Sequence, residues 1–116
     1  MVVRSKKVAM LERGTLIKVS FDPTIGHEQS GNRPALVVSD KVFHVATGFA
    51  LCMPITSKKK SLLFEIEVAG KKVTGVALPH STRMLDLEAR DFIVIEMAVK
   101  AVTEKAQIVL KKIIGD

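Results

Sequence analysis

Short apolar segments separated by polar turns run through residues 15–97, and this pattern limits the fold more than any other feature of the sequence. In residues 15–21 the side chains of Ile17, Val19 and Phe21 fall on alternate positions, which predicts a strand with one buried face. Further strands are expected at residues 34–38, 49–55, 64–68, 73–78, 83–85 and 92–97. So many short strands predict an antiparallel or mixed sheet that is strongly curved.

Three sequence features predict which of these strands is central, which lies at the sheet edge and where a ladder is interrupted. Residues 34–38 are apolar on both faces, which predicts a central strand entered through its proline. Residues 64–68 alternate regularly, which predicts an edge strand with Glu65 and Glu67 facing solvent. Pro54 lacks a backbone donor, so it predicts an interrupted ladder near the end of its strand.

The apolar period changes near the C-terminal end. A set of apolar residues recurs there at helical spacing, namely Ala106, Val109, Leu110 and Ile113. Thr103 is the expected N-cap and Gly115 the stop. A polar connector at residues 40–48 has room for a helical turn. The sequence therefore predicts a mainly β fold with a C-terminal helix packed on the sheet.

Composition narrows the class of protein. The 116 residues are expected to form one domain, with residues 1–11 as a mobile basic leader. The formal net charge of +6 favours a polyanionic ligand. Cys52 is the only cysteine, which excludes an intrachain disulfide and a multi-cysteine zinc site. No stretch approaches the ~20 apolar residues of a membrane helix, so a cytoplasmic protein is expected.

Residues 22–33 are the densest polar segment, and Asp22, Pro23 and Gly31 predict that they form a long loop. Loops of such length tend to be functional. The alternative is an ordinary solvated surface loop. The functional interpretation gains from Arg33, because the apolar strand that follows would fix its backbone while its head reaches a groove.

A linked set of motifs spans residues 13–90. Its members are Arg13-Gly14, Phe21-Asp22-Pro23-Thr24, Gly26-His27-Glu28-Gln29, Gly31, Arg33-Pro34-Ala35-Leu36-Val37, Pro54-Ile55-Thr56-Ser57, Gly75-Val76, Arg83, Leu85-Asp86 and Arg90. In order and spacing this set resembles the MazF/PemK toxin family. The resemblance implies a small SH3-like barrel with a C-terminal helix, a homodimer, and the toxin of a type II toxin–antitoxin system. It also implies sequence-preferring, metal-independent cleavage of single-stranded RNA, in which 2′-hydroxyl attack leaves a 2′,3′-cyclic phosphate and a 5′-hydroxyl, without a cofactor.

Catalytic roles follow from the demands of that reaction. Arg33 is the first candidate, because its planar charged fork can contact two phosphoryl oxygens as charge develops. Thr56 matches the family's threonine after the proline strand, and its hydroxyl either donates to a phosphate oxygen or simply bonds to backbone. Glu28 is a candidate general base and His27 a candidate acid or base. Either residue can instead only hold the loop together, Glu28 as the orienting partner of Arg33.

Candidates for RNA binding surround these positions: His27, Gln29, Ser57, Lys58, Lys59, His80, Ser81 and Arg83. The basic run at residues 58–60 suits phosphate contacts, although a solvated charge run is the alternative. His80 and Ser81 stand where many family members carry Asp-Gln, so the role of that aspartate does not transfer. His80 either replaces it, or catalysis is weakened or lost. His44 is expected to be structural or solvent-exposed, and the three histidines lack the spacing of a metal site.

The expected protein partner is a cognate antitoxin whose acidic, disordered tail would occupy the same cationic groove as RNA. Two alternatives stay open. One is a CcdB-like gyrase poison, which shares the fold without a nuclease site. The other is a non-catalytic relative that binds RNA or antitoxin. The pair Arg33 and Thr56 discriminates the nuclease from a CcdB-like poison, because a pure binder does not need it.

Overall fold

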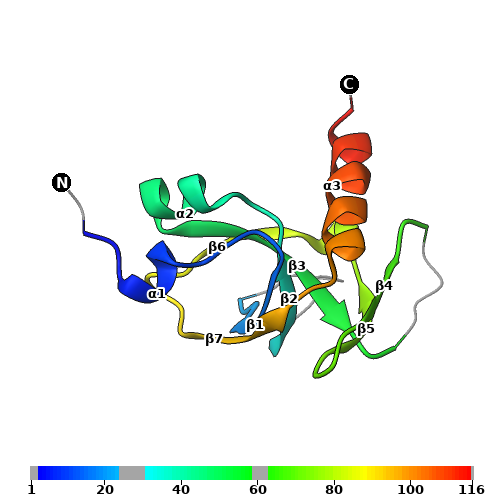
Figure 1. Cartoon of the computed structure of the whole chain (residues 1–116), viewed down its shortest axis with the longest axis horizontal. Helices are drawn as coiled ribbons and strands as arrows, with labels where there is room; N and C mark the ends of the chain where they lie inside the picture. The colour runs from blue at the N-terminus through cyan, green and yellow to red at the C-terminus, as the bar shows by residue number, and fades with distance from the viewer. Residues whose placement is uncertain (1–2, 24–30, 59–62, 116) are drawn as a thin grey trace.

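The computed structural model describes residues 3–23, 31–58 and 63–115 as a curved antiparallel sheet with helices at two of its sides (Figure 1). The strands are β1 (Thr15–Ser20), β2 (Asn32–Val37), β3 (Phe49–Thr56), β4 (Ile66–Ala69), β5 (Thr74–Ala77), β6 (Arg83–Asp86) and β7 (Phe92–Met97). The helices are α1 (Lys6–Ala9), α2 (Lys41–Thr47) and α3 (Lys100–Ile114), and η1 (Pro79–Ser81) is a 3₁₀ turn. The predicted mainly β class, with a curved sheet and a C-terminal helix, is confirmed.

Among the described strands, β3 pairs with the most neighbours, namely β2, β5 and β6. Among the described residues the strand order is β4-β5-β3-β2-β1-β7, and β6 also pairs with β3. β3 pairs antiparallel with β2 along one edge, and with β6 and then β5 along the other. It therefore joins the part of the sheet near α2 to the β4–β5 hairpin on the other side of the molecule (Figure 1).

Pro54 lies inside β3, which continues to Thr56, but the predicted interruption of the ladder is present on the edge that pairs with β6 and β5. Pro54 stands opposite Ala35 of β2, and its carbonyl accepts the backbone N–H of Leu78 at 2.9 Å. On the second edge, β6 pairing ends at Cys52 and β5 pairing begins at Ile55. The proline is tolerated because it stands where the partner changes and a ladder donor is not needed.

Buried side chains pack on both faces of the central strands. One cluster contains Ile17, Val19 and Phe21, together with Val8 and Leu11 from the N-terminal segment. The other contains Leu16, Leu36, Met53, Ile55, Ala106 and Val109. On the other face of β1, Leu16 packs in the second cluster with α3, but Lys18 is exposed. The predicted strand with one buried face is therefore confirmed, except at Leu16. The predicted central strand, β2, is confirmed, although it begins two residues before its proline.

The N-terminal segment is not a mobile leader over its described part. Ser5 caps α1 by accepting the N–H of Val8, and Val8 and Leu11 are 1% and 3% exposed. Burying each of these side chains stabilises the fold by about 2 kcal/mol. The basic residues around them obscured this anchor, because two apolar positions are too few to form a visible period.

α3 begins at Lys100, so Thr103 lies inside the helix and is not its N-cap. The first helical turn starts from the carbonyl of Val99, which accepts the N–H of Val102 at 2.9 Å. Ile113 is 50% exposed rather than packed, because the last turns of α3 rise clear of the sheet (Figure 1). Gly115 ends the helix, as predicted.

The connector at residues 40–48 forms a complete helix, α2, capped by Asp40 and Gly48. His44 of this helix is fully buried. Its ring nitrogens lie 2.8 Å from the carbonyl of Leu11 and 2.6 Å from Ser39 Oγ. The structural role expected for His44 is confirmed, because it ties α2 to the N-terminal segment.

β4 is an edge strand of the described sheet, as predicted, but it begins only at Ile66. Glu67 faces solvent, whereas Glu65 precedes the strand and is half-buried. Within the described ranges no helix combines the length and apolarity needed to cross a membrane.

Candidate functional site

An open cleft of about 500 Å³ lies where β2 begins and β3 ends. Its lining residues are Asn32, Arg33, Pro34, Ile55, Thr56, Ser57, Lys58 and Thr74. The cleft therefore contains Arg33 and Thr56, both half-buried, and the exposed Lys58 beside them.

Strand register explains why Arg33 and Thr56 meet. β2 and β3 are antiparallel, with Ala35 opposite Pro54. Continuing this register by two residues places Arg33 opposite Thr56, and opposite residues of an antiparallel pair point to the same face. The paired residues of β2 and β3 end at Ala35 and Pro54, and just beyond them Arg33 and Thr56 line the same cleft.

Thr56 keeps a donor for a ligand. Its Oγ1 accepts the backbone N–H of Lys58 at 3.3 Å, and a hydroxyl that accepts one hydrogen bond still carries its own proton. Both roles anticipated for Thr56, backbone contact and phosphate contact, are therefore compatible.

Gly75 of β5 lies directly against the backbone of Thr56. Its φ of +149° lies outside the range that other residues adopt easily. A Cβ atom at Gly75 would overlap the carbonyl oxygen of Thr56. The end of β3 can approach β5 this closely only because residue 75 is a glycine.

Residues 20–23 together with Gly31 form the root of the 22–33 loop, called the loop root below. Phe21 N–H donates to the carbonyl of Gly31 at 3.0 Å. Gly31 N–H donates to Asp22 Oδ1, also at 3.0 Å. These bonds close the loop root directly before β2 and Arg33.

Two arginines hold the loop root. Arg83 Nη1 donates to the carbonyls of Phe21 and Pro23. Arg90 Nη1 donates to the carbonyl of Ser20 at 2.8 Å and to that of Asp22. The carbonyls of all four residues from 20 to 23 thus accept a guanidinium.

Arg90 was absent from the predicted site residues. The signal that could have found it is its membership of the family-like motif set. Arg83 was predicted to bind RNA, and its described hydrogen bonds go to backbone.

The remaining predicted residues divide into two groups. Ser57 and Lys58 line the cleft with Arg33 and Thr56. His80 is exposed and Ser81 half-buried in η1, and neither lines this cleft. The other predicted residues lie outside the described part of the chain: His27, Glu28, Gln29 and Lys59.

Two further chemical features bear on the site. Within residues 3–23, 31–58 and 63–115, no three side chains of the His, Cys, Asp or Glu kind gather as a metal site would require. Burial raises the pKa of the Cys52 thiol to about 12, so this cysteine stays protonated near neutral pH and is a poor nucleophile.

Comparisons with known proteins identify relatives of this chain. The family model described as PemK-like, MazF-like toxin of type II toxin–antitoxin system matches residues 12–114. Endoribonuclease toxin MazF of Escherichia coli K12 is 42% identical over 79 residues, which cover 68% of this chain and 71% of MazF. Endoribonuclease toxin ChpB of the same strain is 36% identical over 114 residues, covering 93% and 97% of the two chains.

Solved structures show the same likeness. Deinococcus radiodurans MazF superposes with a TM-score of 0.85 at 33% identity, covering 91% of this chain and 97% of that one. A MazE–MazF complex from the same organism gives a TM-score of 0.78 at 33% identity, covering 90% and 96%. With the family model matched over nearly the whole chain, this protein belongs to the PemK-like, MazF-like toxins of type II toxin–antitoxin systems.

Proposed function

We propose that this protein is the toxin of a type II toxin–antitoxin pair and acts as a metal-independent endoribonuclease on single-stranded RNA. The observation that carries the proposal is the cleft shared by Arg33 and Thr56, with Lys58 on its rim. A guanidinium, a hydroxyl and an ammonium together suit one phosphodiester. The relatives MazF and ChpB are both named endoribonuclease toxins.

The reaction begins when the ribose 2′-oxygen attacks the adjacent phosphorus and its proton passes to a general base. A phosphorane forms, the bond from phosphorus to the 5′-oxygen breaks, and the leaving oxygen takes a proton from a general acid. The products are a 2′,3′-cyclic phosphate and a 5′-hydroxyl. Arg33 stabilises the charge on the phosphoryl oxygens, and Thr56 donates to one of them and places it.

Proton transfer is assigned by the sequence alone. Glu28 is proposed as the general base, and His27 as a further acid or base in the same loop. His80 stands outside the described cleft lining, so its part in proton transfer is best tested directly. If His80→Ala leaves the pH dependence of cleavage unchanged, His80 has no such part.

RNA and antitoxin are proposed to share one surface. Lys58 and Lys59 would contact the RNA backbone, and the net charge of +6 favours a polyanion. Gln29, Ser57, His80, Ser81 and Arg83 are the proposed additional contacts. An antitoxin tail rich in carboxylates would compete for the same cations. The Deinococcus MazE–MazF complex is a solved toxin–antitoxin assembly of a relative.

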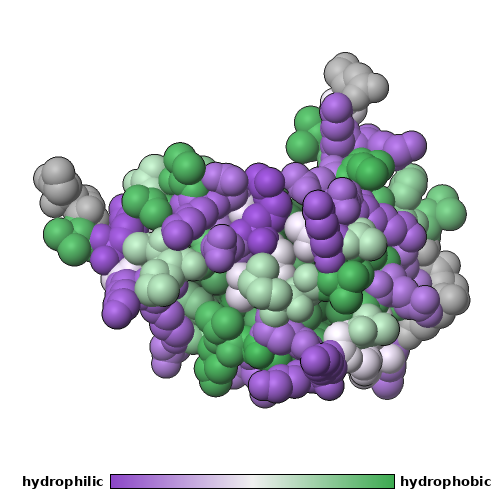
Figure 2. Space-filling view, in the orientation of Figure 1, coloured by the Kyte–Doolittle hydropathy of each residue, from purple (hydrophilic) through white to green (hydrophobic). Residues whose placement is uncertain are grey.

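The proposed working unit is a cytoplasmic homodimer with one domain per chain. The free, buried Cys52 suits a reducing compartment. Ile93 and Val94 on β7 are 64% and 52% exposed, and Figure 2 shows hydrophobic surface along this strand. Exposed apolar side chains of this kind are typical of an interface. Light scattering after gel filtration tests the stoichiometry.

One assay tests the function. Long single-stranded RNA is incubated with the protein in excess chelator, and the new ends are mapped. We expect cleavage to survive chelation and to give cyclic-phosphate ends. Arg33→Ala should lower the rate by on the order of 10² or more, because it removes the main charge stabilisation.

Intact RNA at enzyme excess would contradict the nuclease. A non-catalytic binder would then be favoured, and the one observation on its side is the His80-Ser81 departure from the family pattern. A gel-shift with the same RNA would show whether binding remains.

A further inference from the structure

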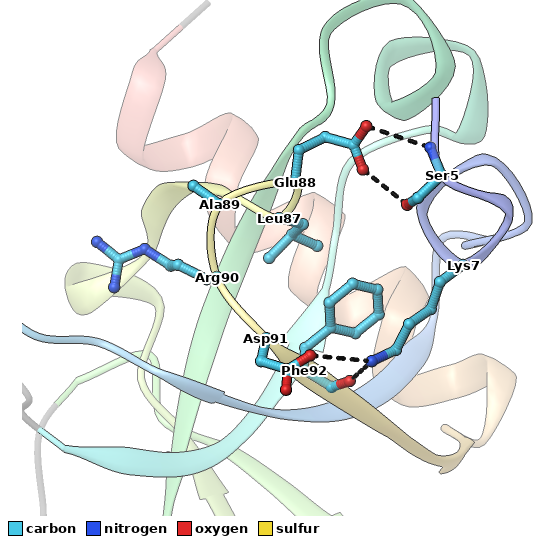
Figure 3. A pocket seen from close by; sticks show the side chains of 8 residues that line it. All are labelled: Ser5, Lys7, Leu87, Glu88, Ala89, Arg90, Asp91 and Phe92. Carbon is cyan, nitrogen blue, oxygen red and sulfur yellow. Dashed lines mark hydrogen bonds and ion pairs between the residues drawn. The ribbon is translucent and has the colours of Figure 1, made fainter. Parts of the chain in front are cut away.

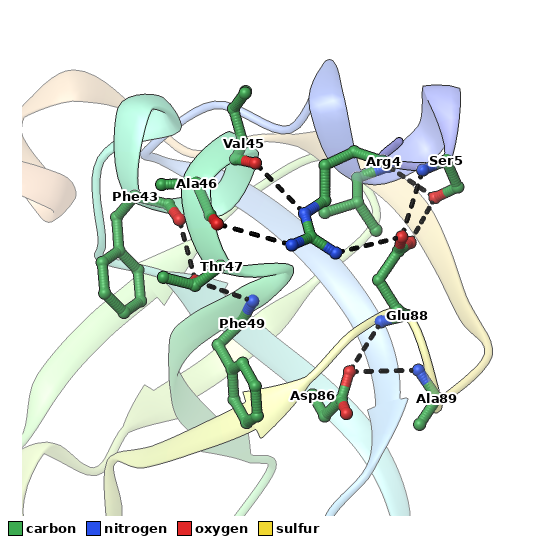
Figure 4. A network of polar contacts seen from close by, with 11 residues as sticks. Arg4, Ser5, Phe43, Val45, Ala46, Thr47, Phe49, Asp86, Glu88 and Ala89 are labelled. Atoms are coloured by element: carbon green, nitrogen blue, oxygen red, sulfur yellow. Dashed lines mark hydrogen bonds and ion pairs between the residues drawn. The ribbon is translucent and has the colours of Figure 1, made fainter. Parts of the chain in front are cut away.

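The N-terminal segment, residues 3–11, is anchored between α2 and the turn at residues 86–92. On the α2 side, Arg4 Nε donates to the carbonyl of Val45 at 3.1 Å, and Nη2 donates to that of Ala46 at 3.4 Å (Figure 4). Beneath it, Val8 packs into the core cluster that also contains Phe92. The segment is therefore fixed by both polar and apolar contacts.

Glu88 is the shared partner on the turn side. Its carboxylate accepts the backbone N–H of Ser5 at 3.2 Å and the Ser5 hydroxyl at 2.6 Å. Arg4 Nη1 lies 3.5 Å from the same carboxylate. The Ser5 hydrogen bonds, with a smaller effect of Arg4, lower the pKa of Glu88, so the carboxylate is charged near neutral pH.

Lys7 adds a second attachment to the turn. Its Nζ donates to the carbonyl of Phe92, lies 4.3 Å from the centre of the Phe92 ring and stands 3.7 Å from Asp91 Oδ1. Figure 3 shows Lys7 and Ser5 approaching the turn from one side, while Arg90 extends from the other.

Gly48 makes room for this arrangement. It caps α2 with a φ of +77°. A Cβ atom there would stand only 2.9 Å from both Arg4 Nη1 and Glu88 Cγ. A side chain at residue 48 would therefore force the Arg4 and Glu88 side chains to shift and would strain the backbone at this φ.

The turn transmits this anchor to Arg90. Asp86 Oδ1 accepts the N–H groups of Glu88 at 3.0 Å and Ala89 at 3.2 Å. The N–H of Arg90 donates to the carbonyl of Asp86 at 3.0 Å. The turn is thus closed on itself, and Glu88 and Arg90 leave it as parts of one hydrogen-bonded unit.

We propose that residues 3–11 brace the site, and that Arg4, Ser5 and Glu88 are positioning residues for Arg33. The path runs from Glu88 through the turn to Arg90, then to the loop root, and from Gly31 to the adjacent β2. Arg83 is the other guanidinium on this root, so loss of the brace loosens the root without releasing it. The inference rests on the proposed function only for its effect on cleavage.

Glu88→Ala removes all three contacts of the carboxylate, and Glu88→Gln keeps an acceptor for Ser5. Arg13→Ala is the matched control. Arg13 also donates to a backbone carbonyl, that of Val38 at 3.2 Å, and pairs with a carboxylate, that of Asp40 at 3.5 Å. Neither contact involves the turn at residues 86–92.

The first measurement is hydrogen exchange, which needs no activity. Glu88→Ala should raise the exchange rates of the Phe21 and Gly31 amides by about fivefold or more, since loosened hydrogen bonds open more often. The Val38 amide, bonded to Leu51 in the sheet, should not change. Arg13→Ala should leave the exchange rates of Phe21 and Gly31 unchanged. Equal exchange of the Phe21 and Gly31 amides in Glu88→Ala and wild type would overturn the brace.

The second measurement is single-turnover cleavage of RNA. Glu88→Ala should lower the maximal rate roughly tenfold with a less than about twofold change in half-saturating RNA, because misplacement of a catalytic group costs rate more than binding. Glu88→Gln should recover part of the rate. In an Arg33→Ala background, Glu88→Ala should cost less than about twofold more.

The outcomes separate the two proposals. If the Glu88→Ala loss is equally large with and without Arg33, the brace does not act through Arg33 and the inference fails. If wild-type protein leaves RNA intact, the proposed function fails, and the exchange rates of Phe21 and Gly31 still decide whether the brace exists.

Discussion

Arg33 and the loop that precedes it are held in different ways. Arg33 stands on β2, between β1 and β3, where backbone ladders and two buried clusters fix the strand. The backbone of the loop root is held by the side chains of Arg83, Arg90 and Asp22, although Phe21 within it packs in the core. Most of β2 is therefore fixed by its ladders, whereas its entry at Arg33 also depends, through the loop root, on residues far from the cleft.

For the part of the site held by strands, which carries Arg33 and Thr56, we expect the largest loss of stability and activity from a substitution at Gly75. Gly75→Ala would drive a methyl group into the carbonyl of Thr56 and impose a strained φ. We expect a loss of about 1–3 kcal/mol in the free energy of unfolding and a fall in cleavage rate of about 10², because Thr56 is displaced. Urea unfolding and single-turnover cleavage measure the two effects. A wild-type cleavage rate in a folded Gly75→Ala protein would mean that the exact position of Thr56 does not matter for cleavage.

Substitutions that weaken the hold on the loop root should lower the cleavage rate with little loss in the free energy of unfolding. Arg83→Ala removes the hydrogen bonds to the carbonyls of Phe21 and Pro23, and we expect a roughly tenfold lower rate. Arg83→Lys should recover part of it, because an ammonium can still donate to both carbonyls.

If Arg83 instead contacts RNA phosphate, Arg83→Ala should weaken binding and reduce its salt dependence. The salt dependence of RNA affinity therefore distinguishes a positioning role for Arg83 from the RNA contact predicted for it.

A smaller effect is expected at Glu96, which holds the turn before β5. Its carboxylate accepts the N–H groups of Lys72 at 2.8 Å, Val73 at 2.9 Å and Lys71 at 3.2 Å. These bonds, led by that from Lys72, lower the pKa of Glu96 below its ordinary 4.5. The stabilisation is full above pH 4.5 and is lost as the pH falls through the lower folded value.

Urea midpoints of wild type and Glu96→Gln should therefore differ at about pH 7 and converge as the pH falls below the ordinary pKa of 4.5. A gap that stays constant across this range would mean that the charge of Glu96 contributes nothing.

The same contrast explains what could be predicted from sequence. Arg33 and Thr56 could be placed because strand alternation and a linear motif each mark them locally. The start of α3 was missed because Val99 offers no side-chain cap. The N-terminal anchor was missed because Val8 packs in one cluster with Phe92, which is far from it in the chain. The hydrogen bonds that hold the loop root were missed because Arg90 donates to the equally distant Ser20. Such distant contacts leave no local pattern in a sequence.

A double-mutant cycle tests the claim that Arg33 and Thr56 act together on one phosphodiester. Single-turnover cleavage in chelator is compared for wild type, Arg33→Ala, Thr56→Val and the double variant. Since groups that act as a unit are not additive, the double variant should lose much less than the product of the two single losses. A loss equal to that product would contradict the claim and mean that the two residues act independently.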